Sequence, residues 1–215
     1  MLGQRTLGST DKGRKFRKKA ADAQLNLVYF PLHKLFKLLC LVAASMADYY
    51  VSWEDYHQDI EKLAIQIYES GWKFNQIVCL AKGGLRIGDI LCRLFDVPLA
   101  ILSTSSYGGA DGRTRGSITF SRDLSMTTPN LGNHVLLVDD LVDSGHSLKK
   151  SIAWLHSKYG FYIDDLRTAV LWHKAHTIIK PDYHVVYLED NPWIHQPFEK
   201  YEVMDLPELV ASHQA

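Results

Sequence analysis

Hydrophobic positions change their spacing along the chain from residue 52 onward. In SWEDYHQDIEKLAIQIYESG (52–71), apolar residues recur every three or four positions, which predicts an amphipathic helix. Ser52 is placed to cap its amino end and Gly71 to end it. Residues 82–95 have the pattern of a Gly-rich turn that leads into a helix, and 146–160 also have the pattern of a helix. Short apolar runs typical of buried strands lie at 76–81, 97–107, 134–140, 165–174 and 182–190.

Strands and helices therefore alternate from about residue 50. This order predicts an α/β fold with a mainly parallel sheet and helices on both faces. Residues 108–130 interrupt the alternation, because they are polar, rich in glycine and too long for a plain connection. We expect a mobile loop or a hairpin flap there.

The charge is unevenly distributed, although the whole chain has 24 basic and 24 acidic residues. Residues 1–45 hold nine Lys/Arg and two Asp/Glu, which leaves 15 basic and 22 acidic residues for 46–215. An acidic main domain argues against a general nucleic-acid binder, which needs a basic face. The chain thus divides into a basic extension (1–45) and a working domain (46–215).

The extension combines a basic block (13–20) with an apolar stretch (28–45) that Pro31, Lys34 and Lys37 interrupt. That stretch is too short and too charged to span a membrane. A secretory signal, with SMA at 45–47 as its cleavage site, is conceivable but has a short apolar core. Our preferred interpretation is a poorly ordered or normally untranslated segment before Met46. A transit peptide and a membrane-surface helix are the alternatives.

The cysteines and histidines add no metal site to this picture. Three cysteines without a CxxC pair indicate reduced thiols in a cytoplasmic protein. The histidines at 173, 176, 184 and 195 do not have the spacing of metal ligands.

The most informative stretch is VLLVDDLVDSGHS (135–147), in which a buried strand runs into carboxylates. In an open α/β sheet, ligands bind beyond the carboxyl ends of the strands. Residues 144–147 then lead into a helix, whose free N–H groups favour a phosphate. The carboxylates of Asp139, Asp140 and Asp143 would repel a phosphate, so they require ribose hydroxyls or Mg²⁺.

This stretch closely resembles the phosphoribosyl-pyrophosphate signature of type I phosphoribosyltransferases, in which two acidic residues precede Asp-Thr-Gly-x-Thr. Serines replace both threonines here and keep the hydroxyl groups, while His146 is larger than usual at the variable position.

Four more stretches resemble the same family in the same order. LAKGGLRIG (80–88) is similar to its pyrophosphate loop, and SSYGG (105–109) to the start of its lid in the 6-oxopurine branch. WHKAH (172–176) carries a lysine where that branch reads the exocyclic oxygen of the purine. NPWIHQPFE (191–199) resembles the base-binding hood of bacterial and archaeal xanthine-guanine phosphoribosyltransferases, with Phe198 where a second Trp is common.

The resemblance implies a role for each matching residue. Asp143 would be the general acid/base, and Asp139 and Asp140 would hold the ribose and Mg²⁺, directly or through water. Lys174, Trp193 and Ile194 would bind the base, and Ser106 and Tyr107 would open a lid over about 107–130. The donor would bind residues Lys82, Gly83, Gly84, Ser144, Gly145, His146 and Ser147.

Simpler roles exist for some of these residues. Lys82 and Lys174 could be solvated lysines, Trp193 a packing residue, and His146 a solvent-facing side chain. One of the arginines at 113, 115 and 122 in the lid could reach pyrophosphate.

The implied activity is Mg²⁺-dependent transfer of phosphoribose to xanthine, guanine or hypoxanthine in purine salvage. We expect a cytoplasmic homodimer or homotetramer that binds phosphoribosyl pyrophosphate and a purine base, with no nucleic-acid partner and no membrane insertion. Two alternatives remain open: a phosphoribosyltransferase for another base, and a non-catalytic regulator that binds the donor. The intact Asp143 and pyrophosphate loop argue against the regulator.

Overall fold

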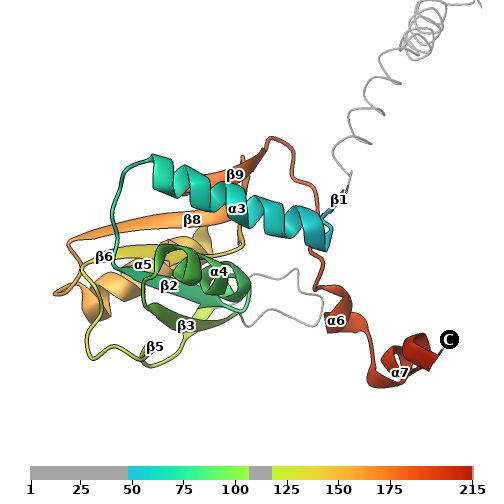
Figure 1. Ribbon diagram of the computed structural model, residues 1–215. Helices are drawn as coiled ribbons and strands as arrows, with labels where there is room; N and C mark the ends of the chain where they lie inside the picture. The colour runs from blue at the N-terminus through green and yellow to red at the C-terminus, as the bar shows by residue number, and fades with distance from the viewer. Residues whose placement is uncertain (1–47, 107–117, 215) are drawn as a thin grey trace, which may run out of the picture. The chain divides into compact units, whose positions relative to one another are not determined.

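The computed structural model describes residues 48–106 and 118–214. The helices are α3 (Trp53–Glu69), α4 (Leu85–Phe95), α5 (His146–Tyr159), α6 (Lys200–Val203) and α7 (Leu206–Gln214) (Figure 1). The strands are β1 (Tyr49–Tyr50), β2 (Gln76–Ala81), β3 (Leu99–Ser106), β4 (Ile118–Phe120), β5 (Ser125–Met126), β6 (His134–Val138), β7 (Leu141–Val142), β8 (Asp165–Lys174), β9 (Tyr183–Leu188) and β10 (Ile194–His195). Within these residues, no helix is both long and apolar enough to cross a membrane.

The main sheet has the order β4-β3-β2-β6-β8-β7, with β5 paired to β3 and β9 paired to β8. The pairings β2–β3, β2–β6, β6–β8, β7–β8 and β8–β9 are all parallel, whereas β4 and β5 run antiparallel to β3. The prediction of a mainly parallel α/β sheet is therefore confirmed. Since sequential parallel strands need crossover connections, the helices must cover its faces.

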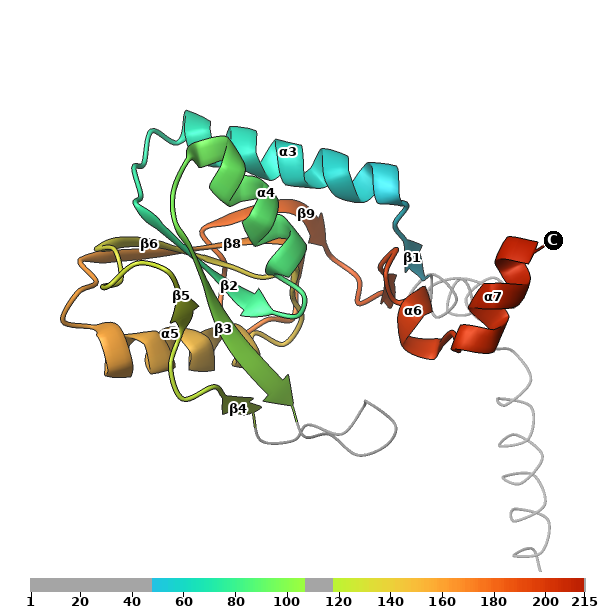
Figure 2. The same ribbon diagram turned by 60° about the horizontal axis from the view of Figure 1, so that its bottom comes forward.

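Two hydrophobic cores lie on opposite faces of this sheet. Successive residues of β6 alternate between them: Leu136 and Val138 pack under α3 and α4, while Val135 and Leu137 pack against α5. Figure 2 shows the sheet between α3 and α4 on one side and α5 on the other. The strand runs that were predicted as buried are thus covered on both faces, which explains why they are continuously apolar.

The first helix begins as its sequence predicts. The Ser52 hydroxyl accepts a hydrogen bond from Asp55 N (3.1 Å), and the Asp55 carboxylate accepts one from Ser52 N (3.4 Å). This reciprocal capping box satisfies two N–H groups that a helix end otherwise leaves free.

The segment predicted as a loop or hairpin flap is described in part. Its strands β4 and β5 return antiparallel along β3, as in a hairpin. Residues 107–117, and with them Tyr107, lie outside the described residues, as does the extension 1–45. The expected lid and the expected extension therefore stay predictions.

The capping box generates a test of stability. Ser52→Ala should lower the free energy of unfolding by about 1 kcal/mol, because it removes the acceptor for Asp55 N. For a chain of this size that corresponds to a Tm lower by about 2–4 °C in differential scanning calorimetry. The double variant with Asp55→Ala should lose less than the sum of the two single losses. Ser157→Ala, at an exposed position in the last turn of α5, is the control and should not lower the Tm.

Candidate active site

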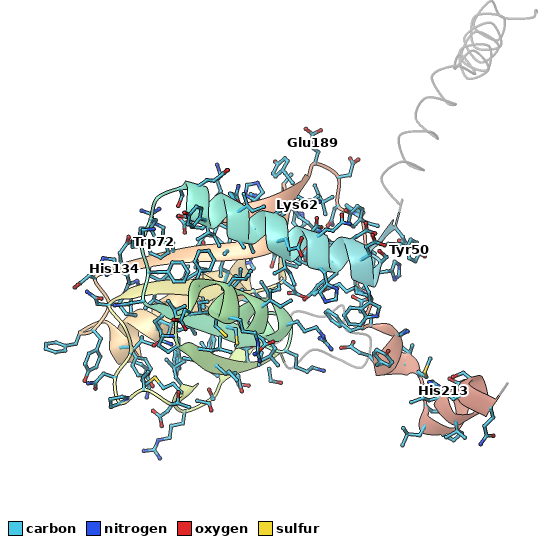
Figure 3. All side chains as sticks on the ribbon, in the orientation of Figure 1. Tyr50, Lys62, Trp72, His134, Glu189 and His213 are labelled. Atoms are coloured by element: carbon cyan, nitrogen blue, oxygen red, sulfur yellow. The ribbon has the colours of Figure 1, made fainter. Side chains whose placement is uncertain are left out.

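The predicted site residues gather where the parallel strands end. Asp139 and Asp140 follow β6, Asp143 follows β7, and Lys174 is the last residue of β8. Lys82 follows β2. In Figure 3, His134 at the start of β6 and Glu189 after β9 lie at opposite ends of the sheet, and the site belongs to the end of Glu189. This is the edge at which open α/β sheets bind ligands.

Two helices begin at this edge without a side-chain cap. The N-cap residues of α4 and α5 are Gly84 and Gly145, and neither first turn contains an acidic residue. The remote helix α3, in contrast, has a complete capping box. Free N–H groups and the positive end of the helix dipole make both glycine-capped ends suitable for phosphate groups. The donor residues predicted at 82–84 and 144–147 occupy these two ends.

The loops also require glycine for reasons of space. A Cβ on Gly83 would lie 2.5 Å from the Asp140 carboxyl group, so the pyrophosphate loop packs directly against the acid pair. Gly145 has φ +79°, in the left-handed region, and a Cβ there would collide with Thr177 and Ile179. Loops far apart in sequence are thereby held together around the site.

The acid pair, Asp139 and Asp140, is electrostatically unfavourable without a ligand. Burial, and then the proximity of Asp140, raises the pKa of Asp139 well above its ordinary value. Burial also raises the pKa of Asp140, although a hydrogen bond from Gln196 Nε2 to its Oδ2 (2.5 Å) acts in the opposite direction. Two half-buried carboxylates that disfavour their own charge are stabilised by a cation.

This property makes the acid pair suitable for the expected Mg²⁺. Carboxylate oxygens are hard ligands, and Mg²⁺ commonly binds through one or two of them together with phosphates and water. Among residues 48–106 and 118–214, no group of three or more His, Cys, Asp or Glu side chains could hold a metal by itself. Protein ligands alone therefore do not complete a site, and a metal held here would need the oxygens of the substrate.

A second charged cluster contains the predicted acid/base. Oδ1 of Asp143 lies 3.3 Å from Lys174 Nζ and 3.1 Å from His176 Nε2. Lys174 is 6% exposed, an unusual burial for a lysine, whereas the Asp143 side chain is 54% exposed. The structure thus brings together the two side chains that were predicted to contact the same edge of the base.

The hydrogen-bond ladder of β8 is irregular just before Lys174. The carbonyl of Asp140 accepts hydrogen bonds from both Leu171 N (3.0 Å) and Trp172 N (3.1 Å). No residue is inserted there, because β8 keeps one register with β6 and β7 on one side and with β9 on the other. Leu171 and Trp172 both pack into the core under α3 and α4, although consecutive strand residues normally face opposite sides.

Strand pairing and an aromatic contact attach the predicted hood, residues 188–205, to the domain. Strand β10 pairs in parallel with β1, and the carbonyls of Trp193 and His195 accept hydrogen bonds from Tyr49 N and Val51 N. Because carbonyls alternate along a strand, that of Ile194 points away from β1. Ile194 itself is buried, and the Trp193 side chain is 57% exposed, as a stacking surface requires.

The second attachment is the aromatic contact of Phe198. Its ring lies 5.9 Å from that of Tyr56, and the Arg86 guanidinium lies 4.4 Å from its centroid. Phe198 is thus a packing residue between the hood and helices α3 and α4.

The remaining predicted residues lie on the outside of the site. Lys82 is exposed, and its Nζ lies 3.7 Å from Glu202 of α6. His146 and Ser147 are exposed in the first turn of α5, while Ser144 is half-buried. Ser106 ends β3, next to the undescribed part of the lid.

Two residues of the site were missed by the sequence reasoning. Gln196 holds Asp140, and His176 holds Asp143. Both lie inside stretches that the sequence analysis singled out, NPWIHQPFE and WHKAH. Their contacts with the two carboxylates become visible only in the folded structure.

The molecule also has a cavity of about 770 Å³ away from these groups. It is lined mainly by apolar residues, including Trp72, Phe74 and Val97, which precede the amino ends of β2 and β3. Its place and lining separate it from the charged edge just described.

The electrostatics of the acid pair generate a prediction about pH. A raised folded-state pKa means that the folded protein keeps protons that the unfolded chain loses above its ordinary pKa of about 3.9. Stability therefore falls as the pH rises through that window, and the penalty persists above the raised pKa. Asp139→Asn removes the charge and keeps the oxygen that accepts Asp140 N, so it should raise the Tm at neutral pH without metal.

Thermal unfolding from pH 4 to 8 measures this effect. The Tm advantage of Asp139→Asn should shrink toward acid pH, where the wild-type carboxyl is also neutral. Glu189→Gln, which neutralises an exposed carboxylate, is the control and should change the Tm little. If Asp139→Asn were no more stable than wild type at neutral pH, the prediction that the charge of Asp139 destabilises the fold would be wrong.

Comparison with known proteins agrees with this arrangement. The family model described as "Phosphoribosyl transferase domain" matches residues 52–202. The chain is 27% identical to the xanthine-guanine phosphoribosyltransferase of a Ruegeria species, over 70% of this chain and 85% of that protein. It is 31% identical to the enzyme of the same name from Roseobacter denitrificans, over 47% of this chain and 61% of that protein.

A solved structure shows the same fold. The purine phosphoribosyltransferase from Pyrococcus horikoshii Ot3 is similar with a TM-score of 0.60 and 27% identity, over 74% of this chain and 99% of that one. The family model covers most of the chain, including both glycine-capped helix ends, the acid pair and Lys174. The chain therefore belongs to the type I phosphoribosyltransferase family.

Proposed function

We propose that this phosphoribosyltransferase transfers phosphoribose from phosphoribosyl pyrophosphate to a 6-oxopurine: xanthine, guanine or hypoxanthine. The observation that carries the proposal is the 3.3 Å contact between Lys174 Nζ and Asp143 Oδ1 at the strand ends. In a 6-oxopurine, N7 and O6 lie side by side on one edge of the base. A lysine donor next to a carboxylate acceptor matches O6 next to a protonated N7.

The relatives support the same class of substrate. Two similar curated proteins have the name xanthine-guanine phosphoribosyltransferase, and the similar structure from Pyrococcus horikoshii is a purine phosphoribosyltransferase. The choice among the three bases is not determined by identities near 27%. The Ile194 carbonyl, which points away from β1, is positioned to read the group at position 2 of the base.

The reaction follows from the charges around the site. The N9 lone pair of the base attacks C1 of the ribose, and the bond from C1 to pyrophosphate breaks with its electrons leaving on pyrophosphate. The N7 proton passes to the carboxylate of Asp143 as general base. The acid pair, together with oxygens of the substrate, would hold Mg²⁺, which would supply positive charge to the departing pyrophosphate.

The chain's other groups bind and orient the donor. The free N–H groups at the start of α4, with Lys82, attract the pyrophosphate, and those at the start of α5 hold the 5′-phosphate. Fixing both ends of the donor aligns C1 with the base. Trp193 stacks on the base, and the predicted lid excludes the water that would hydrolyse the donor. In this proposal the enzyme acts in the cytoplasm as a homodimer or homotetramer.

Turnover with single bases tests the substrate class. The protein is mixed with Mg²⁺, phosphoribosyl pyrophosphate and, in turn, xanthine, guanine, hypoxanthine, adenine, uracil or orotate, and nucleotide and pyrophosphate are measured. Product from at least one 6-oxopurine is expected. Product only from another base would overturn the assignments of Lys174 and Trp193. Donor binding without any product would indicate the non-catalytic regulator.

The role of Asp143 has its own test. Asp143→Asn should lower kcat by about 10²–10⁴-fold, because an amide cannot take the N7 proton. The Kd for the donor, measured by calorimetry with Mg²⁺, should change little, because Asp143 does not contact the pyrophosphate loop or the acid pair. Asp96→Asn, at an exposed aspartate after the carboxyl end of α4, is the control and should keep full activity. Full activity of Asp143→Asn would show that another group takes the proton.

A further inference from the structure

His176 is a residue that the implied roles leave unused, yet its Nε2 lies 3.1 Å from Asp143 Oδ1. An ionised carboxylate only accepts hydrogen bonds, so His176 can hold it only through a protonated Nε2. Lys174 approaches the same oxygen at 3.3 Å. Within residues 48–106 and 118–214, no hydrogen bond or ion pair of the Asp143 side chain falls on Oδ2.

The backbone around His176 is held on both sides. Ala175 N donates to the carbonyl of Leu188 (2.9 Å), which fixes the segment to the end of β9. Ile178 N donates to the carbonyl of Ser144 (3.1 Å), which fixes it to the loop that follows Asp143. The Thr177 side chain also lies against Gly145. The loops that carry His176 and Asp143 are therefore connected by a backbone hydrogen bond, which keeps the two side chains close together.

The two partners of Asp143, Lys174 and His176, have different roles in the proposed reaction. Under the proposed function, Lys174 donates hydrogen bonds to O6 of the base. Its ion pair with Asp143 therefore weakens when the base binds. His176 has no base atom assigned to it and keeps its contact with Oδ1. That contact fixes the carboxylate in the orientation that leaves Oδ2 to accept the N7 proton.

We propose that His176 is a positioning residue of the transfer reaction, whose Nε2–H holds Oδ1 of Asp143 so that Oδ2 meets N7 of the base. This inference rests on the proposed function. A simple surface pair is the alternative: the His176 and Asp143 side chains are 40% and 54% exposed, and such pairs contribute little to stability. The alternative predicts no effect on the chemical step.

Matched variants of His176 distinguish the positioning role from a simple surface pair. His176→Leu keeps the bulk and removes the donor, and His176→Gln places an amide N–H near the position of Nε2. With the preferred 6-oxopurine, His176→Leu should lower kcat by about 10-fold, because misplaced catalytic groups lose rate steeply. Its KM for phosphoribosyl pyrophosphate should stay within about two-fold, and His176→Gln should recover most of kcat. His156→Leu, an exposed histidine of α5, is the control and should match wild type.

A second comparison tests whether His176 acts through Asp143. In the Asp143→Asn background, His176→Leu should cause almost no further loss of kcat, because the carboxylate it orients is gone. An unchanged kcat in His176→Leu, equal losses in the Leu and Gln variants, or the same 10-fold loss in both backgrounds would each overturn the proposal. Wild-type protein that turns over no 6-oxopurine would instead overturn the proposed function, so the two failures are distinguishable.

Discussion

The Asp140 residue connects three segments that are far apart in the sequence. Its carboxyl group lies against Gly83 where a Cβ has no room, and it accepts a hydrogen bond from Gln196. Its backbone carbonyl accepts hydrogen bonds from both Leu171 N and Trp172 N of β8. The pyrophosphate loop, the hood and strand β8 thus meet at one residue. An arrangement of this kind keeps groups from several elements in fixed register, which preorganised catalysis requires.

The edge of the sheet at which the strands end combines groups that favour anions with groups that favour a cation. The helix ends at Gly84 and Gly145 offer free N–H groups to anions, whereas burial raises the pKa values of Asp139 and Asp140 and calls for a cation or for hydroxyl groups. A simple anion would satisfy the helix ends and worsen the acid pair. A ligand that carries phosphates, hydroxyl groups and a metal together satisfies both. The unfavourable charge of the free site is then a cost in stability that supports function.

Most of the fold could be predicted from the sequence because its signals are local. The apolar runs of β2 and β8 and the cap formed by Ser52 and Asp55 depend on neighbouring residues alone. The hydrogen bonds of Leu171 N and Trp172 N to one carbonyl could not be predicted, since they depend on a residue of another segment. Strands β1 and β10 are too short to show a period, and they form only because each offers the other a partner. For the same reason, Gln196 and His176 looked like ordinary polar residues until their distances to Asp140 and Asp143 were known.

In the proposed function, one scaffold would separate recognition of the donor from recognition of the base. The groups predicted to bind the donor come from the starts of α4 and α5, which the capping glycines and the sheet fix in place. The groups predicted to bind the base come from the end of β8 and from the hood, which is attached through β1 and through the Phe198 contact with Tyr56. Changes in the hood can therefore alter the reading of the base at Ile194 without moving the phosphate-binding helix ends. Gln196 crosses this division, because it extends from the hood to Asp140, and the hood residues Glu202 and Phe198 also contact Lys82 and Arg86. In the proposed function, the hydrogen bond of Gln196 is a direct route by which occupancy of the base pocket would affect the carboxylates that are predicted to hold the ribose.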